Sequence, residues 1–169
     1  MNKVPDPAKM VKLITAKEVY LRAMSAWCKN PDPTPARVVV EGDKTTVEFW
    51  YDSGGGYRAV DKYCQTVGSD RREGSVAVSC DGVDVWALFY NSTYSPSVIS
   101  FVREALYQTC DQGVFYGGRG PKGHTGHLYG YRNTTLLVSF TGTFGGEEEV
   151  YLLSSSDTIG RCTYYWLTV

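Results

Sequence analysis

The chain has 169 residues, of which 43% are hydrophobic and 14% aromatic, a composition that suits one compact domain and excludes a disordered tail. Seventeen lysines and arginines against 18 aspartates and glutamates give a net charge of −1, so no overall positive field attracts nucleic acid or an anionic membrane. No apolar run reaches the roughly 18 residues of a membrane span, and residues 1–7 lack the apolar core of a signal peptide. We expect no nucleic-acid partner, no membrane span and, if the protein is secreted, a mature chain.

Residues 1–35 are predicted to form a strand followed by a helix. Val11–Ile14 is an apolar run with the character of a short strand. Thr15 and Glu18 then have the spacing of a capping box, in which a hydroxyl and a carboxylate satisfy free amides at a helix start. Because apolar residues recur at helical spacing beyond this point, the helix should begin near Ala16 and end at the prolines that close the unit.

Residues 36–68 are predicted to form a first ββα unit. Arg37–Glu41 and Thr45–Tyr51 are rich in β-branched and aromatic residues and flank a Gly-Asp turn, which is typical of a hairpin. A run of three glycines then breaks the second strand. The apolar residues of Tyr57–Val67 recur at helical spacing and a glycine follows them, so this segment is predicted to be a helix.

Residues 75–110 are predicted to form a second ββα unit. Ser75–Cys80 and Val83–Tyr90 flank an Asp-Gly pair, the strongest hairpin signal in the sequence. Ser95 precedes a proline at the first helical position, where the missing amide costs nothing. The apolar residues that follow lie on one helix face as far as Cys110.

Residues 127–169 are predicted to contain only strands, after a glycine-rich loop. The expected strands are Leu128–Tyr131, Thr134–Phe140, Glu148–Leu153 and Cys162–Val169. The two ββα units close their second strands on similar hexapeptides, Glu48–Ser53 and Ala87–Ser92. The sequence therefore predicts an α+β fold over residues 1–169: a single-domain α/β sandwich with a mostly antiparallel sheet and about three helices, built from repeated ββα units.

The five cysteines are widely spaced and include no C-x-x-C pair, which fits neither a zinc ribbon nor a thioredoxin-like site. Each predicted helix ends in a cysteine, from which a disulfide to a strand cysteine could join the two layers. The alternative is five reduced, buried thiols in a cytosolic protein. The disulfide candidates are Cys28, Cys64, Cys80, Cys110 and Cys162.

Two N-x-Thr triplets favour secretion. They begin at Asn91 and Asn133, and both are predicted to lie in turns, where a glycan can be carried.

The segment from Gly117 to His127 is the candidate contact surface. It contains five glycines, both histidines and two cations in a predicted loop, a usual location for recognition residues. It lacks the Gly-Lys-Ser/Thr of a phosphate loop, and its two histidines offer too few ligands for a metal, so we expect neither a cofactor nor a metal. The competing interpretation is a solvated connection between strands. The tentative binding residues are Arg119, Lys122, His124, His127 and Tyr129.

Two further patterns are assigned to structure. Neighbouring residues of a strand point to opposite faces, so Glu147–Glu149 cannot converge on one substrate atom and is predicted to be a solvated strand start. The four tryptophans alternate with apolar neighbours and are predicted to be core residues. They are Trp27, Trp50, Trp86 and Trp166.

Part of the chain resembles cysteine-containing secreted fungal proteins, among them the killer toxins of smut fungi and related necrosis-inducing effectors. The resemblance rests on the order of elements and cysteines in Ser75–Cys80, Val85–Tyr90, Phe101–Cys110 and Thr134–Phe140. It implies a compact α/β sandwich that binds a target without catalysis, and it implies a role in virulence or competition.

We therefore expect a secreted, extracellular, effector-like or toxin-like glycoprotein that binds a host or competitor protein or a cell-surface target. Two alternatives remain. One is a small secreted hydrolase or nuclease that uses His124 or His127 as an acid or base. The other is a glycan-binding module that uses exposed aromatic rings.

Overall fold

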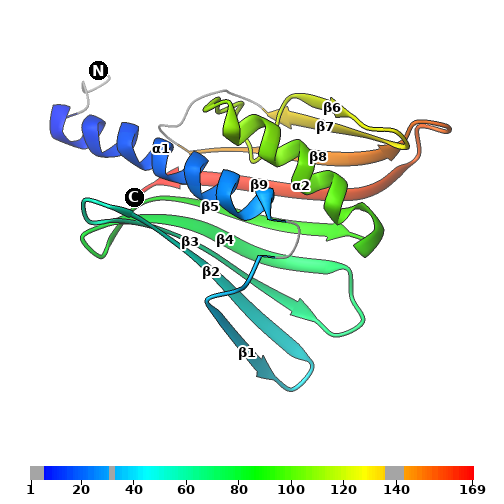
Figure 1. The fold of residues 1–169 in the computed structure, drawn as a ribbon, viewed down its shortest axis with the longest axis horizontal. Coiled ribbons are helices and arrows are strands. Elements are labelled where there is room, and N and C mark those ends of the chain that lie inside the picture. Colours follow the sequence, from blue (N-terminus) through cyan, green and yellow to red (C-terminus); the bar gives the residue numbers. More distant parts are fainter. Residues whose placement is uncertain (1–5, 31–32, 136–142) are drawn as a thin grey trace.

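The structure, a computed structural model, describes residues 6–30, 33–135 and 143–169. This part of the chain forms one nine-stranded antiparallel sheet with two helices on one of its faces (Figure 1). The helices are α1 (Pro7–Lys29) and α2 (Pro96–Asp111), and neither is long and apolar enough to cross a membrane. The strands are β1 (Arg37–Glu41), β2 (Lys44–Gly54), β3 (Tyr57–Thr66), β4 (Arg71–Cys80), β5 (Val83–Tyr94), β6 (Gly123–Thr125), β7 (Tyr129–Thr135), β8 (Thr143–Leu152) and β9 (Thr158–Thr168).

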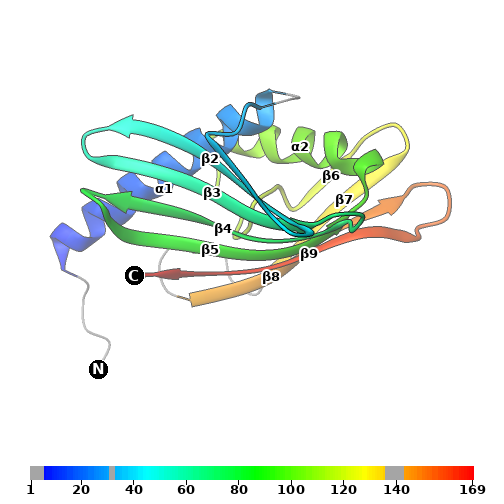
Figure 2. The same cartoon turned by 90° about the horizontal axis from the view of Figure 1, so that it is seen from below.

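The strands are arranged across the sheet in the order β1-β2-β3-β4-β5-β9-β8-β7-β6. Strands β1 to β5 follow one another as hairpins, after which α2 leads the chain to the far edge. Strands β6 to β9 return in sequence order until β9 pairs with β5. The sheet is curved, and both helices lie on the same side of it (Figure 2). The predicted α+β sandwich with an antiparallel sheet is therefore confirmed.

The core lies between the helices and the central strands. Trp86 and Leu88 of β5 and Trp166 of β9 are fully buried. Tyr20 of α1 packs on Trp86 with ring centroids 4.7 Å apart, which anchors the helix to the middle of the sheet.

The second predicted unit, residues 75–110, has the expected order of two strands and a helix. The turn between β4 and β5 is formed by Asp81 and Gly82, whose φ angles of 51° and 79° suit a tight hairpin. Helix α2 begins at Pro96, as the proline predicts, and Ser95 occupies the N-cap position without a side-chain capping hydrogen bond.

The helix predicted over Tyr57–Val67 is wrong, because this segment forms strand β3. It pairs antiparallel with β2 on one side and β4 on the other. Its residues Ala59, Asp61 and Tyr63 follow the two-residue period of a strand and face the helix layer. In short segments the spacing of apolar residues often fits both a helix and a strand. Here the backbone hydrogen bonds to two neighbouring strands decide in favour of the strand.

The loss of this helix corrects two further parts of the predicted fold. The unit at residues 36–68 contains no helix, so the chain is not built from repeated ββα units. The described residues contain two helices instead of about three, and Cys64 lies in a strand.

The strand predicted at Val11–Ile14 is also wrong, because these residues belong to α1. The helix begins at Pro7, and the carboxylate of Asp6 caps it by accepting a hydrogen bond from the Ala8 amide at 3.0 Å. The expected cap residue, Thr15, lies inside the helix and donates its hydroxyl hydrogen to the carbonyl four residues earlier. An earlier cap thus sets the start of the helix.

The C-terminal strands differ from their predicted bounds. Two strands were expected, at Leu128–Tyr131 and at Thr134–Phe140, but the structure has one continuous strand there, β7, which ends at Thr135. Residues 136–140 lie outside the described residues. Strands β8 and β9 both begin earlier than expected, and the short β6 was not predicted.

One of the four predicted core tryptophans lies at the surface. Trp86 and Trp166 are buried, and Trp27 packs against the core. Trp50 is 46% exposed, and the Arg58 guanidinium lies 5.4 Å from its ring centroid. Alternation along β2 places it on the sheet face away from the helices.

Candidate ligand-binding cavity

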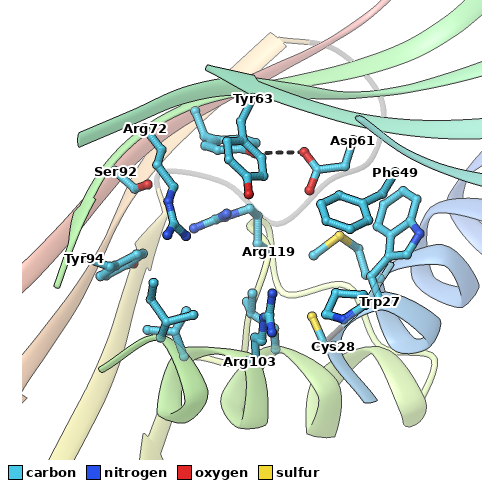
Figure 3. A pocket seen from close by; sticks show the side chains of 16 residues that line it. Trp27, Cys28, Phe49, Asp61, Tyr63, Arg72, Ser92, Tyr94, Arg103 and Arg119 are labelled. Atoms are coloured by element: carbon cyan, nitrogen blue, oxygen red, sulfur yellow. Dashed lines mark hydrogen bonds between the residues drawn. The ribbon is translucent and has the colours of Figure 1, made fainter. Parts of the chain in front are cut away.

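A cavity of about 110 Å³ lies between the helices and strands β2 to β5 (Figure 3). The sheet is curved, and toward β1 its strands extend beyond the helices (Figure 1). The aromatic part of the lining comprises Trp27, Phe49, Tyr63, Tyr90 and Tyr94. The aliphatic part comprises Met24, Pro33, Ile99, Val102 and Leu106.

Three arginines reach this cavity from three different elements. They are Arg72 of β4, Arg103 of α2 and Arg119 of the loop between α2 and β6. Arg72 and Arg103 extend toward Arg119 from opposite walls (Figure 3). The Arg72 guanidinium also lies over the ring of Tyr63, 5.4 Å from its centroid. Asp61 is the one carboxylate among the described lining residues, so cations are in excess around the cavity.

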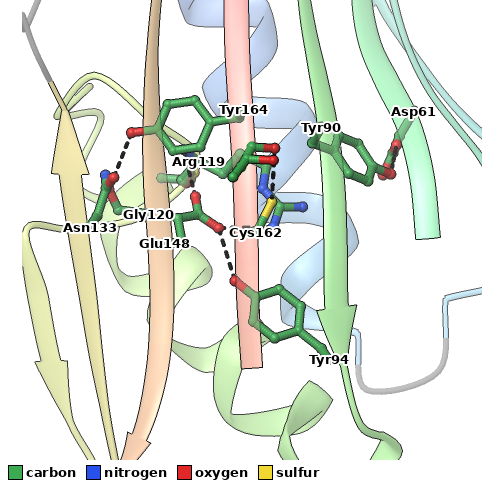
Figure 4. A network of polar contacts seen from close by, with 11 residues as sticks. Asp61, Tyr90, Tyr94, Arg119, Gly120, Asn133, Glu148, Cys162 and Tyr164 are labelled. Carbon is green, nitrogen blue, oxygen red and sulfur yellow. Dashed lines mark hydrogen bonds and ion pairs between the residues drawn. The ribbon is translucent and has the colours of Figure 1, made fainter. Parts of the chain in front are cut away.

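Arg119 is held by a buried ion pair with Glu148 of β8. Its Nη2 lies 2.9 Å from Oε2 of Glu148, and its backbone N–H donates to Oε1 at 3.1 Å (Figure 4). Arg119 is 9% exposed and Glu148 is fully buried. The guanidinium also lies 4.7 Å from the ring centroid of Tyr90. Its Nε–H is buried and has no hydrogen-bond partner among the described residues.

Glu148 belongs to an acidic run that is divided between two environments. The prediction that neighbouring residues of Glu147–Glu149 point to opposite faces is confirmed. Glu147 and Glu149 lie 3.6 and 3.2 Å from nitrogens of the exposed Arg161. The prediction that the run is solvated is wrong for Glu148, which accepts a hydrogen bond from the buried Tyr94 hydroxyl at 3.3 Å.

The glycine-rich segment packs closely where it carries Arg119. A Cβ atom on Gly118 would lie 2.6 Å from the Tyr164 hydroxyl, and one on Gly120 would collide with Tyr131. The Asn133 side-chain amide donates to the Gly120 carbonyl at 3.2 Å. The glycines therefore allow the backbone to approach β7 and β9, and they place this part of the loop in the interior.

The five predicted contact residues lie in separate environments. Arg119 is in the interior and reaches the cavity. Lys122 and His127 are exposed to solvent. His124 and Tyr129 are partly buried against α2.

His124 and Tyr129 share Phe101 of α2 as their packing partner. The His124 ring stacks on Phe101 with centroids 5.3 Å apart, and the Tyr129 ring lies 5.6 Å from it. The His124 Nε2 atom lies 3.2 Å from Oε1 of Glu104. Neither histidine lines the cavity, so the proposed hydrolytic residues are not gathered there.

All five cysteines are free thiols in the structure, so none of the expected bridges between helix and strand is formed. Cys28, near the end of α1, lines the cavity, while Cys80, Cys110 and Cys162 are buried. Burial raises the pKa of Cys28 and Cys162 to about 12, so both thiols stay protonated at neutral pH.

The two predicted glycan acceptors lie in strands and not in turns. Asn91 of β5 is partly exposed, and its amide nitrogen lies 3.4 Å from a carboxylate oxygen of Glu73. Asn133 of β7 is 6% exposed and accepts a hydrogen bond from the Tyr164 hydroxyl at 2.5 Å. Because Asn133 is enclosed and its amide also bonds to the loop, a glycan on it would be incompatible with this packing.

Asp61 combines burial with a defined hydrogen bond. Its Oδ1 accepts a hydrogen bond from the Tyr90 hydroxyl at 2.8 Å. Burial raises the pKa of the Asp61 carboxyl to about 6, against the opposing effects of the Tyr90 hydrogen bond and the positive charges of Arg119 and Arg72. Asp61 is therefore mostly ionised at pH 7 and protonated in mildly acidic solution.

Four residues of the site were missed by the sequence reasoning: Asp61, Arg72, Arg103 and Glu148. A signal was present for the two carboxylates, because each occupies an alternate position on an apolar strand face, where an acid needs a partner. No comparable signal exists for the two arginines, since arginine is common on exposed strands and helices.

Comparison of the chain with protein-family models, with curated proteins and with solved structures gave no match. Within the described ranges, no group of three or more His, Cys, Asp or Glu side chains is placed to hold a metal ion. The function of the chain is therefore inferred from the chemistry of the cavity.

The buried ion pair predicts a large difference between neighbouring glutamates. Glu148→Gln leaves the Arg119 charge buried without its counter-ion and should lower the free energy of unfolding by about 3–5 kcal/mol. Glu147→Gln removes an exposed pair and should cost less than about 1 kcal/mol. Urea unfolding of both variants measures the difference, and equal losses would contradict the buried pair.

The raised pKa of Asp61 predicts a pH dependence of stability. Because the folded state holds this proton more tightly than the unfolded chain, the contribution of Asp61 to stability is greatest below pH 4. It should fall by about 3 kcal/mol between pH 4 and 6 and then stay constant. Asp61→Asn should remove this decrease in the free energy of unfolding. The control variant Asp84→Asn, at an exposed position, should retain it. The measurement is the difference in unfolding free energy between each variant and the wild type from pH 4 to 8.

Proposed function

We propose that this protein binds a small organic anion, in the simplest case a monocyclic aromatic carboxylate, in the cavity between its helix layer and its sheet. The observation that carries the proposal is the convergence of Arg72, Arg103 and Arg119 on an aromatic-lined cavity. Three guanidinium groups against one carboxylate in the lining give the cavity a positive potential, which favours an anionic ligand.

The donors suit a carboxylate in particular. A guanidinium presents a planar set of N–H groups that matches the two oxygens of a carboxylate. Glu148 engages Nη2 and the backbone N–H of Arg119, which itself lines the cavity. Arg103 approaches from the helix on the other side. An anion between these side chains would be held from two walls.

The lining of the cavity suits an aromatic ring. Trp27, Phe49 and Tyr63 supply flat apolar faces on which a ring can pack. A few placed charges within an apolar lining are the usual composition of a small-molecule site.

The secreted, effector-like or toxin-like role would describe where such a binding protein acts. It is supported by the sequence resemblance, the N-x-Thr triplet at Asn91 and the two-layer sandwich. The five free thiols and the buried Asn133 add no support to it.

Ligand binding can be tested with benzoate and its neutral analogue benzamide. Isothermal titration should detect benzoate binding to the wild type, with benzamide at least about tenfold weaker because it carries no charge for the arginines. Arg103→Gln should weaken benzoate binding by a similar factor and leave benzamide binding nearly unchanged.

The matched control is Arg132→Gln. Arg132 pairs with Glu149 on the sheet face away from the cavity, so this variant should bind benzoate like the wild type. Equal affinity for the acid and the amide, or no binding of either, would overturn the proposal.

The secreted role predicts the redox state of the cysteines. Protein recovered from a culture medium should contain two disulfides and one free thiol, as judged by peptide mapping under non-reducing conditions. Five free thiols in that material would contradict both the secreted role and the resemblance to fungal effectors.

A further inference from the structure

We propose that Asp61 is a general base in this cavity and that it moves a proton on a bound aromatic 2-oxo acid, at the carbon next to the oxo group. The inference rests on the proposed anion-binding function, because the arginines must hold the acid beside Asp61. It adds a reaction class, the interconversion of keto and enol forms.

The position of Asp61 is that of a fixed base. It lines the cavity from β3, and the buried Tyr90 hydroxyl holds its Oδ1 at 2.8 Å. This hydrogen bond orients the carboxylate through Oδ1, so Oδ2 is the oxygen that we assign as the base. A base held in one orientation transfers a proton more efficiently than a freely rotating one.

The surroundings of Asp61 adjust its basicity. Burial raises its pKa to about 6, which makes it a stronger base than an exposed aspartate while keeping it mostly ionised at neutral pH. It faces titratable or charged groups from every element packed around it: Tyr90 of β5, Arg72 of β4, Arg119 of the loop, Arg103 of α2 and Cys28 of α1.

The arginines supply the second requirement of this chemistry. Removing a proton next to a carbonyl places negative charge on the carbonyl oxygen, which nearby cations stabilise. A 2-oxo acid carries its carboxylate and its oxo oxygen on adjacent carbons. One guanidinium can therefore hold the carboxylate while another stabilises the developing enolate.

The proposed step balances without any further reactant. The C3–H bond breaks, and its proton forms an O–H bond with Asp61. The electron pair of that bond forms the C2=C3 double bond, and the electrons of the C=O bond move to the oxygen to give an enolate. In reverse, protonated Asp61 returns a proton to C3. When Asp61 exchanges its proton with deuterated solvent, C3 acquires deuterium.

Phenylpyruvate in D₂O tests the inference. Proton NMR should show the benzylic signal disappearing faster with the wild-type protein than in buffer alone. Asp61→Asn should reduce the protein-dependent rate by about 100-fold or more, and Asp84→Asn should leave it unchanged. The rate at low substrate concentration should rise with pH through about 6 and then level, because only ionised Asp61 accepts the proton.

Benzoate binding separates the possible results. Wild-type protein that binds benzoate but causes no exchange above buffer would overturn this inference and leave the proposed function intact. Failure to bind benzoate would overturn both. Exchange that persists in folded Asp61→Asn would also overturn the inference. Asp61→Ser serves as a second variant if the Asn form does not fold, with benzoate binding as the check on its fold.

Discussion

The ion pair between Arg119 and Glu148 connects the parts of this protein that concern its function. A fully buried carboxylate requires a cation, and Arg119 supplies it from a loop 29 positions away in sequence. The contact anchors that loop against β8, and glycines allow the backbone to pass close to Tyr131 and Tyr164. Through Nη2 and the backbone N–H, Glu148 thereby holds Arg119 where this residue lines the cavity.

The cavity itself follows from the shape of the two layers. Tyr20 on Trp86 anchors α1 to the middle of the sheet, while the curved sheet extends beyond the helices toward β1. The space between them is lined by side chains from both layers. A meander of hairpins with one crossing helix thus brings groups from α1, α2, four strands and two loops to a single volume. None of these elements could form such a site alone.

The charges in the cavity explain why binding and proton transfer can share one site. The arginines favour an anion, and Tyr90 holds Asp61 in one orientation beside them. Burial works against the charge of Asp61, whereas the neighbouring guanidinium groups work in its favour. The same environment that attracts a carboxylate therefore also sets the basicity of the acid next to it.

By itself the sequence determined the features that depend on neighbouring residues: the start of α2 at Pro96, the Asp81-Gly82 turn, the α+β class with its antiparallel sheet and the alternation through Glu147–Glu149. Caps, turns and side-chain period act over a few residues, so they can be recognised locally. Only the tertiary structure decided that Tyr57–Thr66 is a strand, that the glycine-rich loop enters the interior and that Asp61 meets the arginines. These outcomes depend on pairing and charge contacts between distant segments, whose energies exceed the local preferences of the segments themselves.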